Sequence, residues 1–252
     1  MKNRKLFAVL LASVALASAQ IAFTSAARPA GKTRFQSTKF TVRVENISTP
    51  DGQTASDGTK FSIALSPGAF VLSGKKAPLF REGKKASRGL EMQAEDGDPS
   101  GLVNQLEMAH YSPALRGVYN TPMGATAPGP IRPGDAYEFS FEATPGMRLH
   151  MTMMQGQSND WFYAPDENGI GLFQKGGHPM SGDVTSQFIL WNAGTEVDEE
   201  LGIGPNQGPR QKAPNTGPDE NGVVTRVSQS IYYNKTAQLF RVTLTPKASM
   251  GM

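Results

Sequence analysis

Apolar and polar residues alternate along several short stretches of the chain, a pattern typical of strands with one buried face. The alternation is clear at Phe40, Val42 and Val44, which are separated by polar residues. Similar apolar runs occur at residues 61–65, 137–142, 149–153, 188–191, 223–227, 230–233 and 239–244. Turn residues separate these runs at irregular intervals, and no long helical pattern is present. The sequence therefore predicts an all-β fold, an antiparallel β-sandwich.

Proline and glycine divide the predicted strands. Ser66-Pro67-Gly68 is expected to end the strand at 61–65. Pro145-Gly146 is expected to join the runs at 137–142 and 149–153 into a hairpin-like pair. This pair leads directly into the acidic segment described below.

Two short segments, 87–94 and 99–109, are the only plausible helices. The acidic linker Glu95-Asp96-Gly97-Asp98 lies between them, lacks the full spacing of an EF-hand loop, and is predicted to be an exposed turn. Residues 111–133 are rich in Pro and Gly and are predicted to form an irregular connection. The long segment 202–222 directly follows an acidic loop, so we expect it to be a flap over a site there.

The first nineteen residues have the features of an export signal: a basic start, an apolar stretch at 6–16, and the small-residue cleavage site Ala17-Ser18-Ala19. The apolar stretch is too short to remain in a bilayer, and no other stretch is long enough. The chain has no cysteine that could carry a lipid. We therefore expect a secreted or periplasmic protein without a stable membrane anchor. The expected organisation is a signal peptide at 1–19, a flexible leader at 20–38, a β-sandwich domain at 39–247 and a tail at 248–252.

Removal of the signal changes the charge of the protein. Three of the 25 Lys and Arg residues lie in the signal, whereas none of the 22 Asp and Glu residues do, so the mature chain has a formal net charge of zero. No nucleic-acid partner is therefore expected. Basic residues nevertheless gather at 75–88, where two interpretations remain: a patch for anionic glycans or lipid headgroups, or a solvated loop. Glu82 and the acidic residues that follow favour the solvated loop.

Oxygen-bearing side chains follow two of the predicted strands. Asp160 directly precedes Trp161, and Asn192 and Glu196 follow the apolar run that ends at Trp191. The two strand ends are expected to meet. Both tryptophans are expected to pack in the core or beneath this site, not to display their faces to a sugar.

These side chains have the chemistry of a calcium site. Calcium takes six to eight oxygen ligands from carboxylates, amides, main-chain carbonyls and water. Gly194 permits the backbone bend that would turn Asn192 and Glu196 inward beside Asp160, and Asp198 is a possible additional ligand. Zinc or copper would require His or Cys nearby. An equally open alternative is that these are surface loop acids that water and local backbone satisfy.

The same residues resemble the motifs of a known family. Ser158-Asn159-Asp160-Trp161-Phe162, followed by Trp191-Asn192-Ala193-Gly194-Thr195-Glu196, is similar to the paired S-x-D-W and W-D-A-G-T-D/E motifs of the spondin N-terminal domain. Segments similar to its bacterial, stand-alone branch lie within 65–68, 89–97, 181–184 and 208–217, and the similarity spans about residues 40–245.

This resemblance implies an eight-stranded antiparallel β-sandwich, similar to C2 domains, with calcium held by loops at one end. Carried across by motif position, the ligands are Asp160, Asn192 and Glu196. Asn192 stands where the family usually has Asp, and the loss of one negative charge is expected to weaken calcium binding to the millimolar range. Glu196 often replaces Asp in the bacterial branch. In animal relatives the domain belongs to extracellular-matrix adhesion proteins.

We expect an exported, non-enzymatic calcium-binding domain that contacts extracellular matrix, surface glycan or another protein. The alternative is a secreted glycan-acting hydrolase with Asp160 and Glu196 as paired carboxylates, which predicts a wide aromatic cleft and a carboxyl group of raised pKa. A third hypothesis is a polysaccharide-binding surface on which Trp161 and Tyr163 share one face of a strand. The three histidines, His110, His150 and His178, are each interpreted as structural or surface residues.

Overall fold

The computed structural model describes residues 37–228 and 236–247. The predicted signal peptide, nearly all of the predicted leader, the predicted strand at 230–233 and the predicted tail lie outside these ranges. Within them, no helix has both the length and the apolar character needed to cross a membrane.

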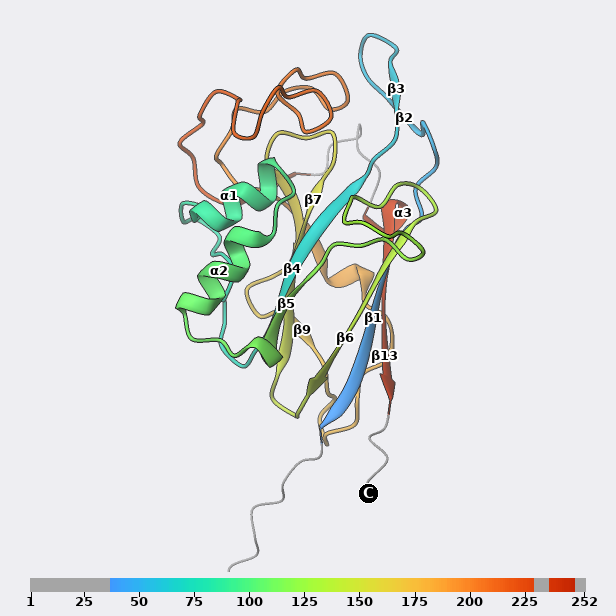
Figure 1. The fold of residues 1–252 in the computed structure, drawn as a ribbon, viewed down its shortest axis with the longest axis vertical. Helices are drawn as coiled ribbons and strands as arrows, with labels where there is room; N and C mark the ends of the chain where they lie inside the picture. Colours follow the sequence, from blue (N-terminus) through green and yellow to red (C-terminus); the bar gives the residue numbers. More distant parts are fainter. Residues whose placement is uncertain (1–36, 229–235, 248–252) are drawn as a thin grey trace, which may run out of the picture. The chain divides into compact units, whose positions relative to one another are not determined.

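The described residues form an antiparallel β-sandwich, as predicted (Figure 1). Of their thirteen strands, eight have four or more residues. The smaller main sheet has the order β10 (Gly182–Asp183), β13 (Phe240–Lys247), β1 (Thr38–Asn46), β6 (Ala136–Ala143). The larger sheet has the order β12 (Thr225–Arg226), β11 (Phe188–Asn192), β8 (Trp161–Pro165), β7 (Arg148–Gln155), β4 (Leu65–Ser73), β5 (Arg116–Tyr119), and β9 (Ile170–Gly171) also pairs with β7. A separate two-stranded sheet consists of β2 (Gln53–Thr54) and β3 (Lys60–Phe61).

An apolar core fills the space between the two main sheets. Val42 and Val44 of β1 are buried in it, as their alternation with polar residues predicts. Tyr163 of β8 packs edge-on against Phe240 of β13, with the ring centroids 4.7 Å apart. One face of each sheet supplies this core, because successive side chains of a strand point to opposite faces.

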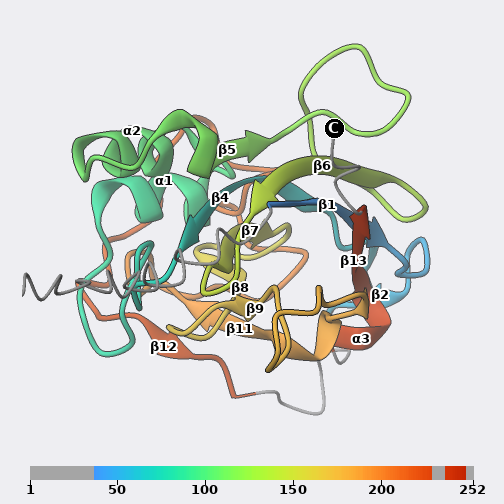
Figure 2. The same ribbon diagram turned by 90° about the horizontal axis from the view of Figure 1, so that it is seen from below.

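Two helices cover the outer face of the larger sheet. They are α1 (Arg88–Glu95) and α2 (Ser100–Met108), close to the two predicted segments. Figure 2 shows both on the side of this sheet away from β1 and β13. The side chain of Ser87 caps α1 by accepting a hydrogen bond from the backbone N–H of Leu90. The described chain also has the short helices η1 (Pro113–Leu115), η2 (Thr185–Gln187) and α3 (Thr236–Leu239).

A second apolar core lies beneath these helices. Leu90, Leu102 and Leu106 pack there with Phe162 and Trp191 from the larger sheet. The central strands are therefore covered on both faces, which the alternating pattern does not predict.

The interpretations of His150 and of the two tryptophans can be compared with this packing. His150, interpreted from the sequence as a structural or surface residue, is buried, and burial lowers its pKa to about 4. It is therefore a structural residue, one of the two interpretations made from the sequence. Trp161 and Trp191 are both buried, as predicted.

Two local strand predictions were wrong. Ser66-Pro67-Gly68 lies within β4, where the register against β7 shifts between Leu65 and Gly68. A local irregularity of this kind accommodates proline inside a sheet, so these residues shift the register without ending the strand. Residues 111–133, predicted to be irregular, contain β5, which pairs with β4.

The predicted hairpin across Pro145-Gly146 was also wrong. β6 pairs with β1 in the smaller main sheet, whereas β7 pairs with β4 and β8 in the larger one. The turn therefore connects the two sheets, and β7 then leads to the acidic segment at Asp160.

Candidate metal centre

The two predicted acidic segments lie side by side at one end of the larger sheet. β8 and β11 are antiparallel neighbours, and Asn192 lies opposite Trp161. The backbone N–H of Ala193 donates to the Asp160 carbonyl at 3.1 Å, which extends the pairing by one residue. Gly194 then adopts a φ of +70°, a conformation that favours glycine, and turns the chain over Asp160.

Asp160 is wholly buried, with 0 % of its surface exposed. Its Oδ2 accepts hydrogen bonds from the backbone N–H groups of Thr195 at 2.7 Å and Glu196 at 3.2 Å, and from the Thr195 hydroxyl at 3.2 Å. Its Oδ1 is also buried and has no hydrogen-bond partner among the described residues. Burial raises the pKa of Asp160 to about 6, against the effect of the Thr195 and Glu196 hydrogen bonds.

Asn192 and Asp198 are bonded to each other. The Asn192 amide Nδ2 donates to Asp198 Oδ2 at 3.1 Å, and its Oδ1 accepts from the backbone N–H of Gly194 at 2.5 Å. Burial raises the pKa of Asp198. The orientation of the Asn192 amide is therefore fixed by its hydrogen bonds to Gly194 and Asp198.

Glu196 is directed toward the long loop at 202–222. Its side chain is buried, Oε1 accepts from the backbone N–H of Gly217 at 2.9 Å, and Oε2 accepts from Asn159 Nδ2 at 3.3 Å. Burial raises its pKa. The predicted ligands thus share one end of the sheet, but their oxygens are bonded to different groups of the protein.

Glu95, at the end of α1, belongs to the same neighbourhood. It is 2 % exposed, and its Oε2 is buried without a hydrogen-bond partner in the described residues. Burial raises its pKa to about 8, a hydrogen bond with the Thr195 side chain opposes this, and the nearby charge of Glu196 adds to it. The prediction of an exposed turn at 95–98 was wrong for Glu95. No pattern in the sequence indicates that α1 packs against β7 and β8, so the role of Glu95 could not be read from it.

The loop at 202–222 lies against these carboxyl groups, in the place where a flap is predicted. Asp96 Oδ1 accepts hydrogen bonds from Gln211 Nε2 at 3.0 Å and from the backbone N–H of Asn215 at 3.3 Å. Gly217 lies so close to Glu196 that a Cβ there would be 2.4 Å from the Glu196 Cδ. Acidic side chains of the site therefore hold the loop directly.

This end of the sheet concentrates carboxyl groups. Within residues 37–228 and 236–247, no Lys or Arg forms an ion pair with Asp160, Glu95, Glu196 or Asp198. No three or more His, Cys, Asp or Glu side chains of those residues are arranged as a group that could hold a metal ion. Asp160 Oδ1 and Glu95 Oε2 are buried without a hydrogen-bond partner among the described residues, whereas the side-chain oxygens of Asn192 and Glu196 already accept hydrogen bonds.

The two alternative functions can be compared with this geometry. The raised pKa of Asp160 agrees with the hydrolase hypothesis, but Asp160 and Glu196 are buried and do not face a wide aromatic cleft. A glycan could not reach either carboxyl group while the 202–222 loop is in place. The stacking hypothesis was wrong, because Trp161 and Tyr163 share a face that lies in the core.

No family model matches the chain, and a search of curated proteins finds no similar sequence. The resemblance to the spondin N-terminal domain therefore stays a prediction carried by the paired motifs.

Proposed function

We propose that the protein is an exported, non-enzymatic binding domain of the spondin type, in which calcium fixes the loops at the Asp160 end of the larger sheet. The observation that carries the proposal is the wholly buried Asp160 carboxyl group, whose Oδ1 has no hydrogen-bond partner among the described residues. A buried carboxylate needs a counter-charge, a hydrogen-bond donor or a proton. Glu95, in the same neighbourhood, also has a buried oxygen without a hydrogen-bond partner among the described residues. Two carboxyl groups therefore need a counter-charge, a donor or a proton.

The side chains that would hold the ion offer only oxygen. Asp160 and Glu95 would bind the ion through the oxygens that lack hydrogen-bond partners. Asn192 and Glu196 would supply further oxygen ligands, and Asp198 would lie near the ion. Such a donor set matches the preference of calcium, and water would fill the remaining positions. The ion would supply positive charge to carboxyl groups that form no ion pair with Lys or Arg within the described residues.

A bound ion would affect a surface as well as the buried site. A pocket of about 740 Å³ lies beside the 202–222 loop, and Pro209, Arg210 and Gln211 of that loop line it. Asp96 also lines the pocket and holds Gln211. Neutralising the neighbouring carboxyl groups would stabilise the loop as a wall of the pocket. We propose this pocket as the surface for an extracellular protein or glycan partner.

Thermal unfolding of residues 20–252 in EDTA and in a calcium series tests the proposal. An ion that binds only the folded protein stabilises it by RT ln(1 + [L]/Kd), about 1.4 kcal/mol at 10 mM calcium for a Kd of about 1 mM. The test variant is Asp160→Asn, which keeps one acceptor oxygen for the Thr195 and Glu196 N–H groups. Glu138→Gln removes a carboxylate from the exposed side of β6 and is the matched control.

We expect calcium to raise the unfolding temperature of the wild type and of Glu138→Gln but not of Asp160→Asn. An equal calcium response in wild type and Asp160→Asn would contradict the proposal, and so would no response at 10 mM.

A further inference from the structure

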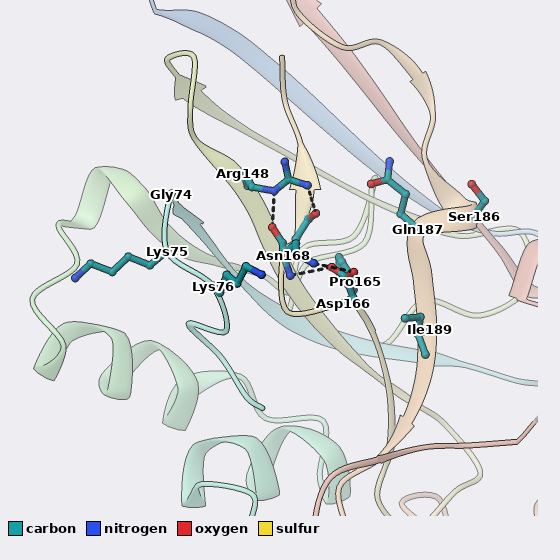
Figure 3. A pocket seen from close by; sticks show the side chains of 11 residues that line it. Gly74, Lys75, Lys76, Arg148, Pro165, Asp166, Asn168, Ser186, Gln187 and Ile189 are labelled. Carbon is teal, nitrogen blue, oxygen red and sulfur yellow. Dashed lines mark hydrogen bonds between the residues drawn. The ribbon is translucent and has the colours of Figure 1, made fainter. Parts of the chain in front are cut away.

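A second pocket lies at the opposite end of the larger sheet. It has a volume of about 540 Å³ and is lined by Arg148 at the start of β7, Pro165 at the end of β8, and Gln187 and Ile189 near the start of β11 (Figure 3). β8 runs from Asp160 toward this pocket, so its five residues separate the two sites by roughly 17 Å. The pocket is therefore independent of the candidate metal centre.

Positive charge dominates this pocket. Its lining includes Lys75, Lys76 and Arg148 but only one acidic residue, Asp166. In Figure 3 the Lys76 side chain points toward Asn168 and Asp166, whereas Lys75 points away from them. Neither lysine forms an ion pair within the described part of the chain.

The lone acid is already occupied by its own turn. Asp166 Oδ1 accepts from the backbone N–H of Asn168 at 2.8 Å, and Oδ2 accepts from Asn168 Nδ2 at 3.1 Å. The pKa of Asp166 is lowered: burial raises it, and the Asn168 hydrogen bonds and nearby Arg148 outweigh that effect. Asp166 is thus charged, but both of its oxygens accept hydrogen bonds from Asn168, and within the described residues it forms no ion pair with the cations of the pocket.

Arg148 is held in place by the backbone. Its Nε donates to the Asn168 carbonyl at 2.5 Å and its Nη2 to the Gly169 carbonyl at 2.9 Å. Its Nη1 has no hydrogen-bond partner in the residues that the structure describes. A fixed guanidinium with one free nitrogen is suited to an anionic oxygen, because little side-chain freedom is lost on binding.

The remaining lining residues suit a sugar. Ser186 and Gln187 are exposed and offer neutral hydrogen-bonding groups, and Ile189 and Pro165 offer aliphatic surface. The volume lies in the range of small-molecule pockets. We propose that this pocket binds an acidic saccharide, with its carboxylate or sulfate group at Lys76 and Arg148 and its hydroxyl groups toward Gln187. This proposal assigns a ligand-binding role to Lys76 of the basic segment 75–88.

Isothermal titration calorimetry in EDTA tests this inference. The probes are an oligogalacturonate, a sulfated oligosaccharide and a neutral oligogalactan of matched length, with anionic phospholipid vesicles as a separate arm. The variants are Lys76→Ala and Gln187→Ala, and Lys85→Ala is the matched control because Lys85 is an exposed lysine of the same basic segment that does not line the pocket. Near-UV circular dichroism confirms that each variant is folded. Arg148 is left unchanged because it holds the turn at 168–169.

We expect at least one acidic oligosaccharide to bind and the neutral one not to bind. The acidic probe that binds shows whether the ligand carries a carboxylate or a sulfate group. Lys76→Ala is expected to weaken binding about tenfold, the loss of one charge-assisted hydrogen bond, and Lys85→Ala by about twofold at most. Gln187→Ala is expected to weaken binding by about threefold to tenfold.

Several results would overturn the inference: no binding of either acidic probe, equal binding of the neutral probe, binding of vesicles alone, or an equal effect of Lys85→Ala and Lys76→Ala. The outcome does not depend on calcium, since the titration is carried out in EDTA.

Discussion

Glu95 and Asp160 illustrate how the surroundings of a residue change its chemistry. Both are carboxyl groups within short acidic segments, where exposure to water is the usual expectation. Burial instead raises the pKa of Glu95 to about 8 and that of Asp160 to about 6. Without a cation, Glu95 is therefore protonated at neutral pH. A cation and a proton are alternative ways to satisfy the same buried oxygens.

The raised pKa of Glu95 makes a prediction for the metal-free protein. The folded state binds this proton up to about pH 8, whereas the unfolded state releases it near pH 4.5. The stability that the proton supplies is fully present below pH 4.5 and is lost as the pH rises through about 8. We expect the free energy of unfolding in EDTA, measured with urea, to fall across this window.

Glu95→Gln is expected to flatten this dependence between about pH 6 and 8. Below about pH 6 a dependence of the same sign is expected to remain, because the pKa of Asp160 is also raised. An unchanged slope between pH 6 and 8 in Glu95→Gln would show that Glu95 does not carry this proton.

Individual elements were predictable to the extent that their signals are local. The helix at α1 has its cap at Ser87, and β1 and β6 have clear alternation, so the sequence predicts them well. β4 was missed after its first residue, because the register shift between Leu65 and Gly68 tolerates a Pro-Gly pair that elsewhere marks a turn. Bulges and sheet changes depend on partner strands, which the local pattern does not contain.

The candidate site was predictable only in part, for a related reason. Asp160 and Asn192 lie in neighbouring strands whose ends have a recognisable motif, so their proximity could be expected. Glu95 lies at the end of helix α1, 65 positions before Asp160 in the sequence, and only the tertiary packing brings it near Asp160. The flap at 202–222 was expected from its length and position, but its attachment through Asp96 and Glu196 was not.

Gly217 tests whether this attachment matters. A Cβ at residue 217 would lie 2.4 Å from the Glu196 Cδ, so Gly217→Ala must displace the loop or the carboxyl group. We expect faster hydrogen exchange in residues 202–222 and a smaller calcium effect on the unfolding temperature. Gly129→Ala is the matched control, because a Cβ there meets nothing within 4 Å. Equal exchange in the two variants would contradict the role of Gly217.

At the scale of the molecule, the helices make the larger sheet the middle of three layers. The covered strands β7 and β8 connect the two ends of the sheet, and each end has its own charged site. The acidic end lies beneath the 202–222 loop, and the basic pocket lies near Arg148. The net charge of zero expected for the mature chain does not reveal that acidic and basic groups gather at opposite ends of the sheet.

The helical layer is expected to be an integral part of the fold. Leu102 of α2 is wholly buried in the second core, so Leu102→Ala should lower the free energy of unfolding by about 2 to 5 kcal/mol. Met108, in the same helix, is 73 % exposed, so Met108→Ala should change it by about 0.5 kcal/mol or less. Urea denaturation of both variants measures the difference. Similar values would mean that the helix is not part of the cooperative core.

The central claim is that a divalent cation occupies the buried carboxyl cluster at Asp160. Its most direct test is a crystal structure of the protein grown with calcium, with anomalous diffraction data to identify the ion. The account predicts an anomalous peak about 2.3 to 2.6 Å from Asp160 Oδ1, with an oxygen of Glu95 as a further ligand. A water or a protonated carboxyl group at that position, with no anomalous peak in 10 mM calcium, would contradict it.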